Sequence, residues 1–376
     1  MGVVSAWFDP EDPRQWSGVS NGLIGELRRL GVYAGHRSST PWRGMSRLVY
    51  RWEKLTGREK GWTRRAEMRA VTRLSDLVLW ATTPAGTDGW VHLPNLNGPA
   101  TRGRYVTFHD MSPAQLLAAG PELAPSFGYP HATRRQLEWV VRRQVALYKG
   151  AYAVCVSSRF VADSLVRDHG IDAGRIRVVA MGRNADIPPP ADRDWSTPRF
   201  LFIGRHWKRK NGDAVVRAFT RVLKEVPEAR LDVVGGHPPI DVEGVTTHGH
   251  VAVSQPEGRE KIEGLFAAAT CFVVPSLMEP FGIVYLEAGA AGLPCIATKN
   301  GGMETSVGPG GILLDPLDDE AIYRAMRSMC DPDLARRTGE IARERAPLFT
   351  WSAFGQRILR SLDLQPIPGV TLADFL

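Results

Sequence analysis

Short apolar runs alternate with amphipathic helical patterns along most of the chain, and this alternation limits the fold more than any other feature. Parallel strands need crossover helices, so the pattern predicts parallel sheets covered by helices on both faces. The alternation stops at residues 187–198, IPPPADRDWSTP, where four prolines exclude a regular helix or strand, and then restarts. The sequence therefore predicts two doubly wound α/β domains in tandem, facing each other across a cleft.

The chain length agrees with this division, because 376 residues exceed what one hydrophobic core usually organises. We assign residues 1–186 to an acceptor-side domain, 187–198 to a linker and 199–350 to a nucleotide-binding domain. Residues 351–376 are predicted to form a terminal helix that packs back toward the first domain. The first-half strands are placed at apolar runs that include LVLWATT and RYVTFHD.

Neither a membrane span nor a secretory signal is predicted. The longest largely apolar run, Leu265 to Met278, has 14 residues, and a bilayer span needs about 20. The N-terminus, MGVVSAWFDPED, lacks a basic leader and a small-residue cleavage site. We therefore expect a cytoplasmic protein. Its four cysteines show no CxxC spacing, which indicates buried free thiols rather than a zinc site.

The basic residues are concentrated in the first half of the chain. Residues 1–190 hold 26 Lys and Arg against 16 Asp and Glu, and the remainder holds 21 against 24. A helix predicted from Trp42 to Thr56 would carry a basic stripe of Arg43, Arg47, Arg51 and Lys54. Two interpretations stay open for this stripe. It is either a solvated face or a surface for an anionic partner, such as a phosphorylated acceptor or peripheral contact with an anionic membrane. We expect no nucleic-acid partner.

The segment CFVVPSLMEPFGIVYLEAGAAGLPCIATKNGG carries the strongest chemical signal. A buried strand leads into a loop with Glu279, Phe281 and Gly282, and a helix beginning at Ile283 carries Glu287. A helix start offers unsatisfied N–H groups and a positive dipole end, which favour a diphosphate. The two carboxylates could accept hydrogen bonds from sugar hydroxyls. Two glutamates eight positions apart are common by chance, so the strand–loop–helix setting makes the pattern specific.

A basic patch follows the first strand of the second half, in FLFIGRHWKRKNGDAVVRAF. Arg205 at the strand end offers a guanidinium that can bind a phosphate in a bidentate manner, and Lys210 offers a point charge. Both suit the charge that develops on a leaving diphosphate. Lys208 and Arg209 are interpreted as solvated surface charges.

The segment around Glu279 and Glu287 resembles the family 4 type of retaining glycosyltransferases, which have the GT-B fold and carry two glutamates separated by seven residues in this setting. The resemblance implies that Glu279 contacts the transferred sugar and Glu287 the nucleotide ribose. It also implies that the amides of four successive loop and helix residues hold sugar and phosphate: Phe281, Gly282, Ile283 and Val284. The basic patch resembles the family's diphosphate clamp, which assigns Arg205 and Lys210 to it.

Two further segments match the family in the first half. TFHD resembles the place of a histidine beside the donor sugar, which implies that role for His109. The loop WSG before a helix matches the donor-facing glycine loop, which often has two glycines. This chain has only Gly18 there. The run SSRFVADSLVRDHGIDAGRIRVVAMGRNAD resembles the stretch from the fifth strand to the domain boundary.

The resemblance implies sugar transfer from a nucleoside diphosphate sugar to a sugar, lipid-linked or small-molecule acceptor, with retained anomeric configuration. It implies neither a cofactor nor a metal ion. Asp331-Pro-Asp333 is interpreted as a helix start rather than a metal motif, and His248 and His250 lack partners for metal ligation. The alternatives are a GT-B epimerase or phosphorylase, and a nonenzymatic glycan- or membrane-binding protein.

Overall fold

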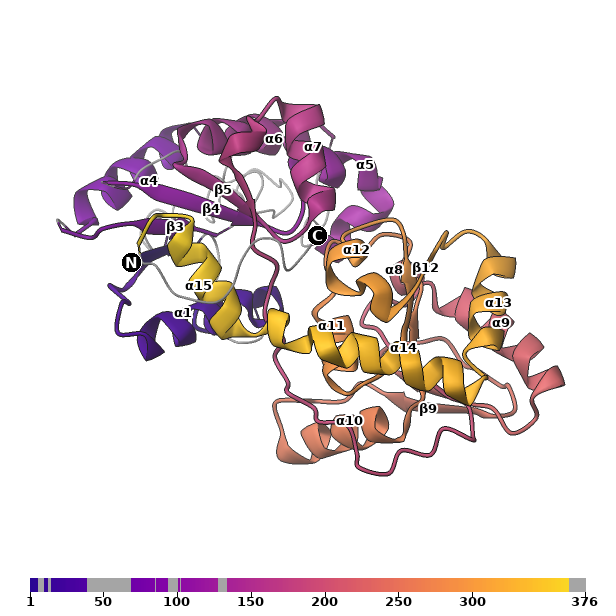
Figure 1. Ribbon diagram of the computed structural model, residues 1–376. Coiled ribbons are helices and arrows are strands. Elements are labelled where there is room, and N and C mark those ends of the chain that lie inside the picture. Colours follow the sequence, from indigo (N-terminus) through magenta and orange to yellow (C-terminus); the bar gives the residue numbers. More distant parts are fainter. Residues whose placement is uncertain are drawn as a thin grey trace. The chain divides into compact units, whose positions relative to one another are not determined.

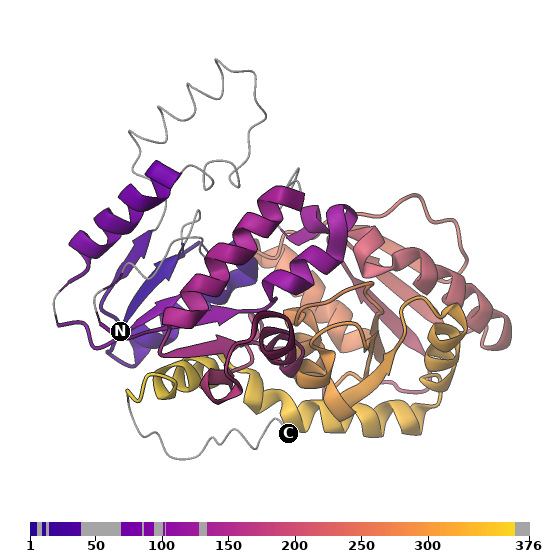
Figure 2. The same cartoon turned by 90° about the horizontal axis from the view of Figure 1, so that it is seen from above.

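The computed structural model describes residues 1–5, 10–12, 15–38, 69–84, 86–93, 101, 103–127 and 134–364, and it divides the chain into two compact units. Met1–Met181 and Trp351–Leu376 belong to the first unit, and Gly182–Thr350 form the second. Each unit is a parallel β-sheet with helices packed on its faces (Figure 1, Figure 2). The predicted α/β architecture with two doubly wound parts is confirmed.

The sheet of the first unit has the strand order β2-β1-β3-β4-β5-β6 within the described residues, and all its pairings are parallel. Its strands are β1 (Gly2–Ser5), β2 (His36–Ser38), β3 (Trp90–His92), β4 (Tyr105–His109), β5 (Ala153–Val156) and β6 (Ile176–Val178). The helices described around it are α1 (Val19–Arg29), α4 (Arg69–Thr82), α5 (Pro113–Leu123), α6 (Arg134–Gly150), α7 (Arg159–His169) and α15 (Trp351–Arg360), with short 3-10 turns at Gln15–Gly18, Ala124–Phe127 and Ala173–Arg175.

Successive residues of β4 show how helices cover both faces of this sheet, because side chains alternate between faces along a strand. The Phe108 ring lies 4.8 Å from that of Phe354 on α15, and the His109 ring lies 4.8 Å from that of Tyr148 on α6. In Figure 1, α1 and α15 lie on one side of the strands, and α4, α6 and α7 lie on the other. Helix α15 packs on α1, although more than 300 residues separate them.

The strand predicted at LVLWATT is wrong, because these residues form the second half of α4 and its end. Only Leu79 and Thr83, four positions apart, are buried, while Leu77, Val78 and Trp80 are exposed. A short apolar run fits a buried strand or a helix equally well, so its length and composition cannot decide between them. The strand between β1 and β4 is instead β3, which the sequence interpretation missed.

The sheet of the second unit has the order β12-β11-β10-β7-β8-β9, again with parallel pairings only. Its strands are β7 (Arg199–Ile203), β8 (Arg230–Val234), β9 (Val245–Gly249), β10 (Cys271–Val274), β11 (Cys295–Thr298) and β12 (Gly311–Leu314). Its helices are α8 (Trp207–Lys210), α9 (Gly212–Glu225), α10 (Pro256–Ala268), α11 (Ile283–Ala290), α12 (Met303–Ser306), α13 (Asp319–Ser328) and α14 (Pro332–Arg345), with 3-10 turns at Gly308–Gly310 and Ala346–Phe349.

The predicted linker, residues 187–198, lies in the second unit, and the chain passes between the units at Met181 and Gly182. An extended proline-rich segment has no internal backbone hydrogen bonds, so its place is fixed by other contacts. Ile187 is buried in the core of the unit. The Arg193 guanidinium donates to the carbonyls of Ala269 and Ala291, at the ends of α10 and α11, where helical carbonyls lack partners.

All four cysteines are free thiols. Cys155, Cys271 and Cys295 are buried within strands, and Cys330 is half-buried at the end of α13. The prediction of buried thiols without disulfides is confirmed for the three strand residues.

Candidate functional site

The chain order of the second sheet reverses between β7 and β10, because β8 and β9 extend it on one side and β11 and β12 on the other. Ligands of open parallel sheets bind outside the carboxyl ends of the strands at such a reversal. The loop after β7 carries Arg205 and leads into α8 with Lys210, and the loop after β10 carries Glu279. The topology thus places these predicted residues at one edge of one sheet.

The Glu279 carboxylate is the centre of a buried ion cluster. Its Oε2 accepts hydrogen bonds from Lys210 Nζ at 2.5 Å, from Arg209 Nη1 at 3.1 Å and from Ser276 Oγ at 3.1 Å. Burial alone would raise the pKa of Glu279, but the charges of Lys210 and Arg209 outweigh it and hold the pKa below its ordinary value. Glu279 is therefore ionised at neutral pH.

The backbone around Glu279 is held from both sides. Leu277 N–H donates to the Arg209 carbonyl at 2.8 Å, and Glu279 N–H donates to the Asn300 carbonyl at 3.2 Å. The Glu279 carbonyl accepts from Gly302 N–H at 3.0 Å. A Cβ on Gly301, whose φ is +152°, would lie 1.9 Å from that carbonyl oxygen, so no other residue fits there. Chain segments after β7 and β11 therefore fix the loop after β10.

Helix α11 begins directly after this loop. Gly282 precedes the helix with φ +72°, and a Cβ there would lie 2.5 Å from the Tyr285 ring. Phe281 is buried, with its ring 6.3 Å from that of Phe349. Ile283 and Val284 form the first turn, where N–H groups have no intrahelical acceptors and the dipole is positive. The arrangement supplies amides beside the Glu279 carboxylate.

The cluster carries more positive than negative charge. Arg205 is exposed at the end of β7, and His206 beside it has a pKa lowered by burial and by the charges of Arg209, Arg205 and Lys210. Arg209 and Lys210 bond to the one carboxylate, and Arg205 adds a third cation at the end of β7, although burial lowers the pKa of Lys210. An excess of positive charge at a helix N-terminus favours an anionic ligand.

Glu287 lies on the second turn of α11 and is half-buried. Burial raises its pKa to about 7, against the opposing influence of the Ala185 and Asn184 backbone and of the Arg183 charge. This carboxyl can therefore be protonated near neutral pH, unlike an exposed glutamate. It can act as a hydrogen-bond donor or acceptor, and its predicted contact with a ribose stays a prediction.

His109 and Gly18 belong to the first unit. The His109 side chain is buried against Tyr148, and burial lowers its pKa to about 3. It is therefore neutral across the physiological range. Among the residues that the structure describes, its Nε2 has no hydrogen-bond partner. Gly18 has φ +79° directly before α1, and Trp16 and Ser17 also have positive φ. The predicted places of His109 and Gly18 beside a sugar donor remain predictions.

The structure separates two cations that the sequence interpretation treated alike. Lys208 is exposed, whereas the Arg209 side chain is only 11% exposed and bonds to Glu279. The interpretation of Arg209 as a solvated charge is therefore wrong. Both residues lie in the four-residue helix α8, and only the position of the loop after β10 decides which of them turns inward. No signal in the sequence distinguishes the two.

Asp331 and His248, which the sequence offered as possible metal ligands, each bond to other groups of the protein. Asp331 Oδ1 accepts from the N–H groups of Asp333 and Leu334 and caps α14, so the capping interpretation is confirmed. His248 bonds to Asp232 at 2.8 Å. Within the described part of the chain, no group of three or more His, Cys, Asp and Glu side chains could hold a metal ion.

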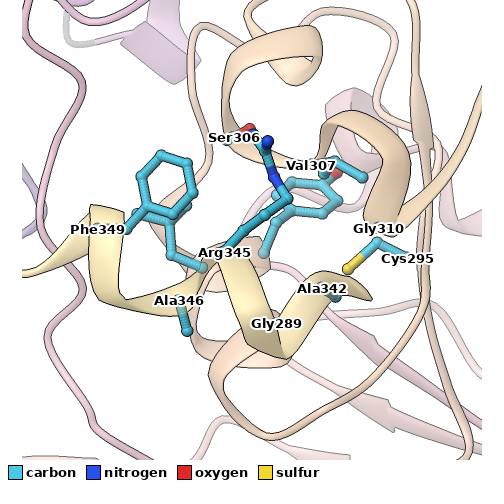
Figure 3. A pocket seen from close by; sticks show the side chains of 11 residues that line it. Gly289, Cys295, Ser306, Val307, Gly310, Ala342, Arg345, Ala346 and Phe349 are labelled. Carbon is cyan, nitrogen blue, oxygen red and sulfur yellow. The ribbon is translucent and has the colours of Figure 1, made fainter. Parts of the chain in front are cut away.

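Behind α11 lies a cavity of about 10 Å³, roughly the space of one water molecule (Figure 3). Its lining includes Tyr285, Ser306 and Arg345, and Arg345 Nη2 donates to the Thr305 carbonyl at 2.9 Å. This cavity is far too small for a nucleotide or a sugar. The candidate site is therefore the edge of the sheet at Glu279 and not this small cavity.

The candidate site lies within the part of the chain that matches a family model. Residues 197–331 match the family model of the glycosyl transferases group 1. D-inositol 3-phosphate glycosyltransferase of Streptomyces avermitilis is 34% identical over 219 residues, which cover 50% of this chain and 47% of that protein. Mannosylfructose-phosphate synthase of Agrobacterium fabrum is 24% identical over 72% of this chain and 63% of its own length. The chain thus spans about half the length of the first relative.

Solved structures share the fold over nearly the whole chain. Sucrose-phosphate synthase from Thermosynechococcus elongatus aligns with a TM-score of 0.68 at 21% identity, covering 96% of this chain and 98% of that one. WaaG, a glycosyltransferase involved in lipopolysaccharide biosynthesis, aligns with a TM-score of 0.64 at 15% identity, covering 97% and 99%. Both have the GT-B fold, so the fold predicted from the resemblance is confirmed.

Proposed function

We propose that this chain, whose residues 197–331 match the group 1 glycosyl transferases, transfers a sugar from a nucleoside diphosphate sugar to an acceptor hydroxyl, with retained configuration and without a metal ion. The observation that carries the proposal is the excess of positive charge at Glu279, where Arg209 and Lys210 both bond to one carboxylate beside the N-terminus of α11. A diphosphate matches that charge, and the carboxylate next to it suits the hydroxyl groups of an attached sugar.

In the proposed reaction, the bond between the anomeric carbon and the phosphate oxygen breaks, and its electron pair stays with the diphosphate. An acceptor hydroxyl oxygen forms the new bond at that carbon, and its proton passes to the departing diphosphate oxygen. Arg205, Lys210 and the first amides of α11 stabilise the charge that develops on the leaving diphosphate. Glu279 orients the sugar, and Glu287 receives the ribose. His109 and Gly18 are proposed to contact the donor as well.

The acceptor is proposed to be a sugar, a lipid-linked sugar or a small polyol. Two of the similar proteins are named after a phosphorylated small molecule: D-inositol 3-phosphate glycosyltransferase and mannosylfructose-phosphate synthase. A phosphorylated acceptor would also suit the 26 basic residues against 16 acidic ones in the first 190 positions. Phosphorylated sugars and polyols are therefore the first acceptors to test.

We expect transfer to proceed in the presence of a chelator and to give a product with the donor's anomeric configuration. Two cations and a helix N-terminus already offset the diphosphate charge, so no divalent ion is needed for that purpose. Release of nucleoside diphosphate from a panel of sugar nucleotides, with EDTA, measures the rate, and proton NMR of the product gives its anomer. Release that needs no acceptor would favour an epimerase or hydrolase. An inverted product or a strict magnesium requirement would contradict the proposal.

We also propose peripheral contact with an anionic membrane, on the evidence of α4. Its solvent-facing side carries Leu77, Val78 and Trp80, which are 58%, 47% and 47% exposed, together with the exposed Arg73. Exposed apolar side chains beside basic ones are typical of interfacial helices. The basic stripe from Arg43 to Lys54 lies outside the described residues. Within the described residues, no helix is long and apolar enough to cross a bilayer.

Binding to vesicles tests this contact. The wild type should cosediment with phosphatidylserine vesicles at low salt and lose binding as salt rises, because each basic residue contributes about 1 kcal/mol or less near an acidic surface. Exchanging Leu77 and Trp80 for Gln should weaken binding severalfold. Leu317→Gln is the matched control, because Leu317 is 80% exposed but lies in the second unit. Equal binding of all three proteins would exclude the α4 surface.

A further inference from the structure

Arg209 contacts three successive residues of the loop after β10. Its backbone carbonyl accepts from Leu277 N–H at 2.8 Å. Its Nη1 donates to the Met278 carbonyl at 3.1 Å and to Glu279 Oε2 at 3.1 Å. A single residue of α8 thus fixes both the backbone of this loop and the side chain that follows.

The two oxygens of the Glu279 carboxylate differ in their contacts. The donors Lys210, Arg209 and Ser276 all bond to Oε2. Within the described residues, Oε1 accepts no hydrogen bond. Each carboxylate oxygen offers about two acceptor positions, so Oε1 keeps its full capacity for hydroxyl groups of a ligand. The orientation of this free oxygen depends on what holds Oε2.

We infer that Arg209 is a positioning residue that holds Glu279 with Oε1 directed to the sugar of the donor, a role that rests on the proposed function. Lys210 and Arg209 divide two tasks. Lys210 is a compact point charge on a flexible stem, suited to a diphosphate that arrives and leaves. Arg209 is a planar donor, and the two hydrogens of its Nη1 are used by the loop carbonyl and the carboxylate. Arg209 therefore keeps Glu279 in place while Lys210 engages the leaving group.

This assignment separates the binding of the intact donor from that of its diphosphate part. Removing the Arg209 side chain should release Glu279 and weaken binding of a sugar nucleotide about tenfold. Binding of the matching nucleoside diphosphate should change less than threefold, because Arg205, Lys210 and the α11 amides remain. Arg209→Lys should restore part of the loss, because a single ammonium can replace one of the two Nη1 bonds.

The experiment uses Arg209→Met and Arg209→Lys, with Lys208→Met as the matched control that removes the neighbouring exposed cation from the same helix. Calorimetry compares UDP with UDP-glucose and GDP with GDP-mannose. A cycle with Glu279→Gln tests the coupling, and the effects of Arg209→Met and Glu279→Gln on sugar nucleotide binding should not add. Equal losses for the sugar nucleotide and the diphosphate would overturn the inference, because Arg209 would then bind phosphate directly. Unchanged binding would also overturn it.

A second readout needs no ligand. Crystal structures of Arg209→Met and of Lys208→Met show whether the Glu279 carboxylate keeps its bond to Ser276. We expect it to rotate away in the first variant and to stay in the second. An unmoved carboxylate in Arg209→Met contradicts the positioning role. If none of the four nucleotides binds the wild type, the proposed function fails, and these two structures alone decide the role of Arg209.

Discussion

Lys210→Ala and Arg205→Ala are each expected to lower the rate of nucleoside diphosphate release about a hundredfold or more. A preorganised charge on the leaving group typically contributes about 3 kcal/mol to lowering the barrier. Lys210 Nζ lies 2.5 Å from Glu279 Oε2, and Arg209 keeps that carboxylate paired when the lysine is removed, so the fold should persist. Steady-state kinetics with saturating sugar nucleotide measures the effect.

Lys208→Ala is the control for Lys210, because this exposed lysine belongs to the same short helix and carries the same charge. Its rate should stay within about twofold of the wild type, as is usual for exposed substitutions away from a site. Circular dichroism and thermal unfolding of all three variants separate a lost charge from a lost fold. Rates like the wild type in either clamp variant would remove that residue from the proposed mechanism.

Glu279→Leu is expected to lower the free energy of unfolding by about 3–5 kcal/mol, because it leaves buried cations without their counter-charge. The side chains of Glu279, Lys210 and Arg209 are only 7%, 9% and 11% exposed, so solvent screens this cluster little. A nucleoside diphosphate should stabilise the variant more than the wild type, because it replaces the missing negative charge. Urea unfolding with and without UDP or GDP measures both effects.

The matched control is Glu320→Leu, which breaks an ion pair with Arg221 whose partners are 51% and 46% exposed. Exposed pairs contribute about 1 kcal/mol or less. The free energy of unfolding should also depend on pH in a defined direction. The pKa of Glu279 lies below its ordinary value, so its contribution is full above the unfolded pKa and disappears as the pH falls through the folded one. Glu279→Leu should lack this acid loss. A stability change no larger than that of Glu320→Leu would contradict the buried cluster.

The sequence predicted those parts of the site that follow from strand ends. Arg205, Lys210 and Glu279 each follow a buried apolar strand, and strands of a parallel sheet place their carboxyl ends at one edge. The glycine at 282 was also predictable, because a close backbone approach before a helix requires it. Gly301 was not singled out, since a glycine is required there only by the carbonyl of Glu279, in the loop after a different strand.

Contacts between distant segments could not be predicted. Arg209 and Lys208 are adjacent and chemically similar, and only the packing of α8 against the loop after β10 separates them. The run LVLWATT has the composition of a buried strand, but most of its apolar side chains face solvent on α4. The pKa of Glu287 likewise depends on the passing chain at Asn184 and Ala185, which no local pattern reveals.

The bonds of Arg193 place a permanent cation at the carboxyl end of α11, the helix whose first turn forms part of the proposed diphosphate site. A helix dipole is negative at its last carbonyls and positive at its first amides. Arg193 therefore offsets the negative partial charge at the carboxyl end of this eight-residue helix. The positive partial charge at its amino end would be offset by a bound anion. The proline-rich segment that was predicted to be a linker therefore places a positive charge at the carboxyl end of α11, and a bound diphosphate would place a negative charge at its other end.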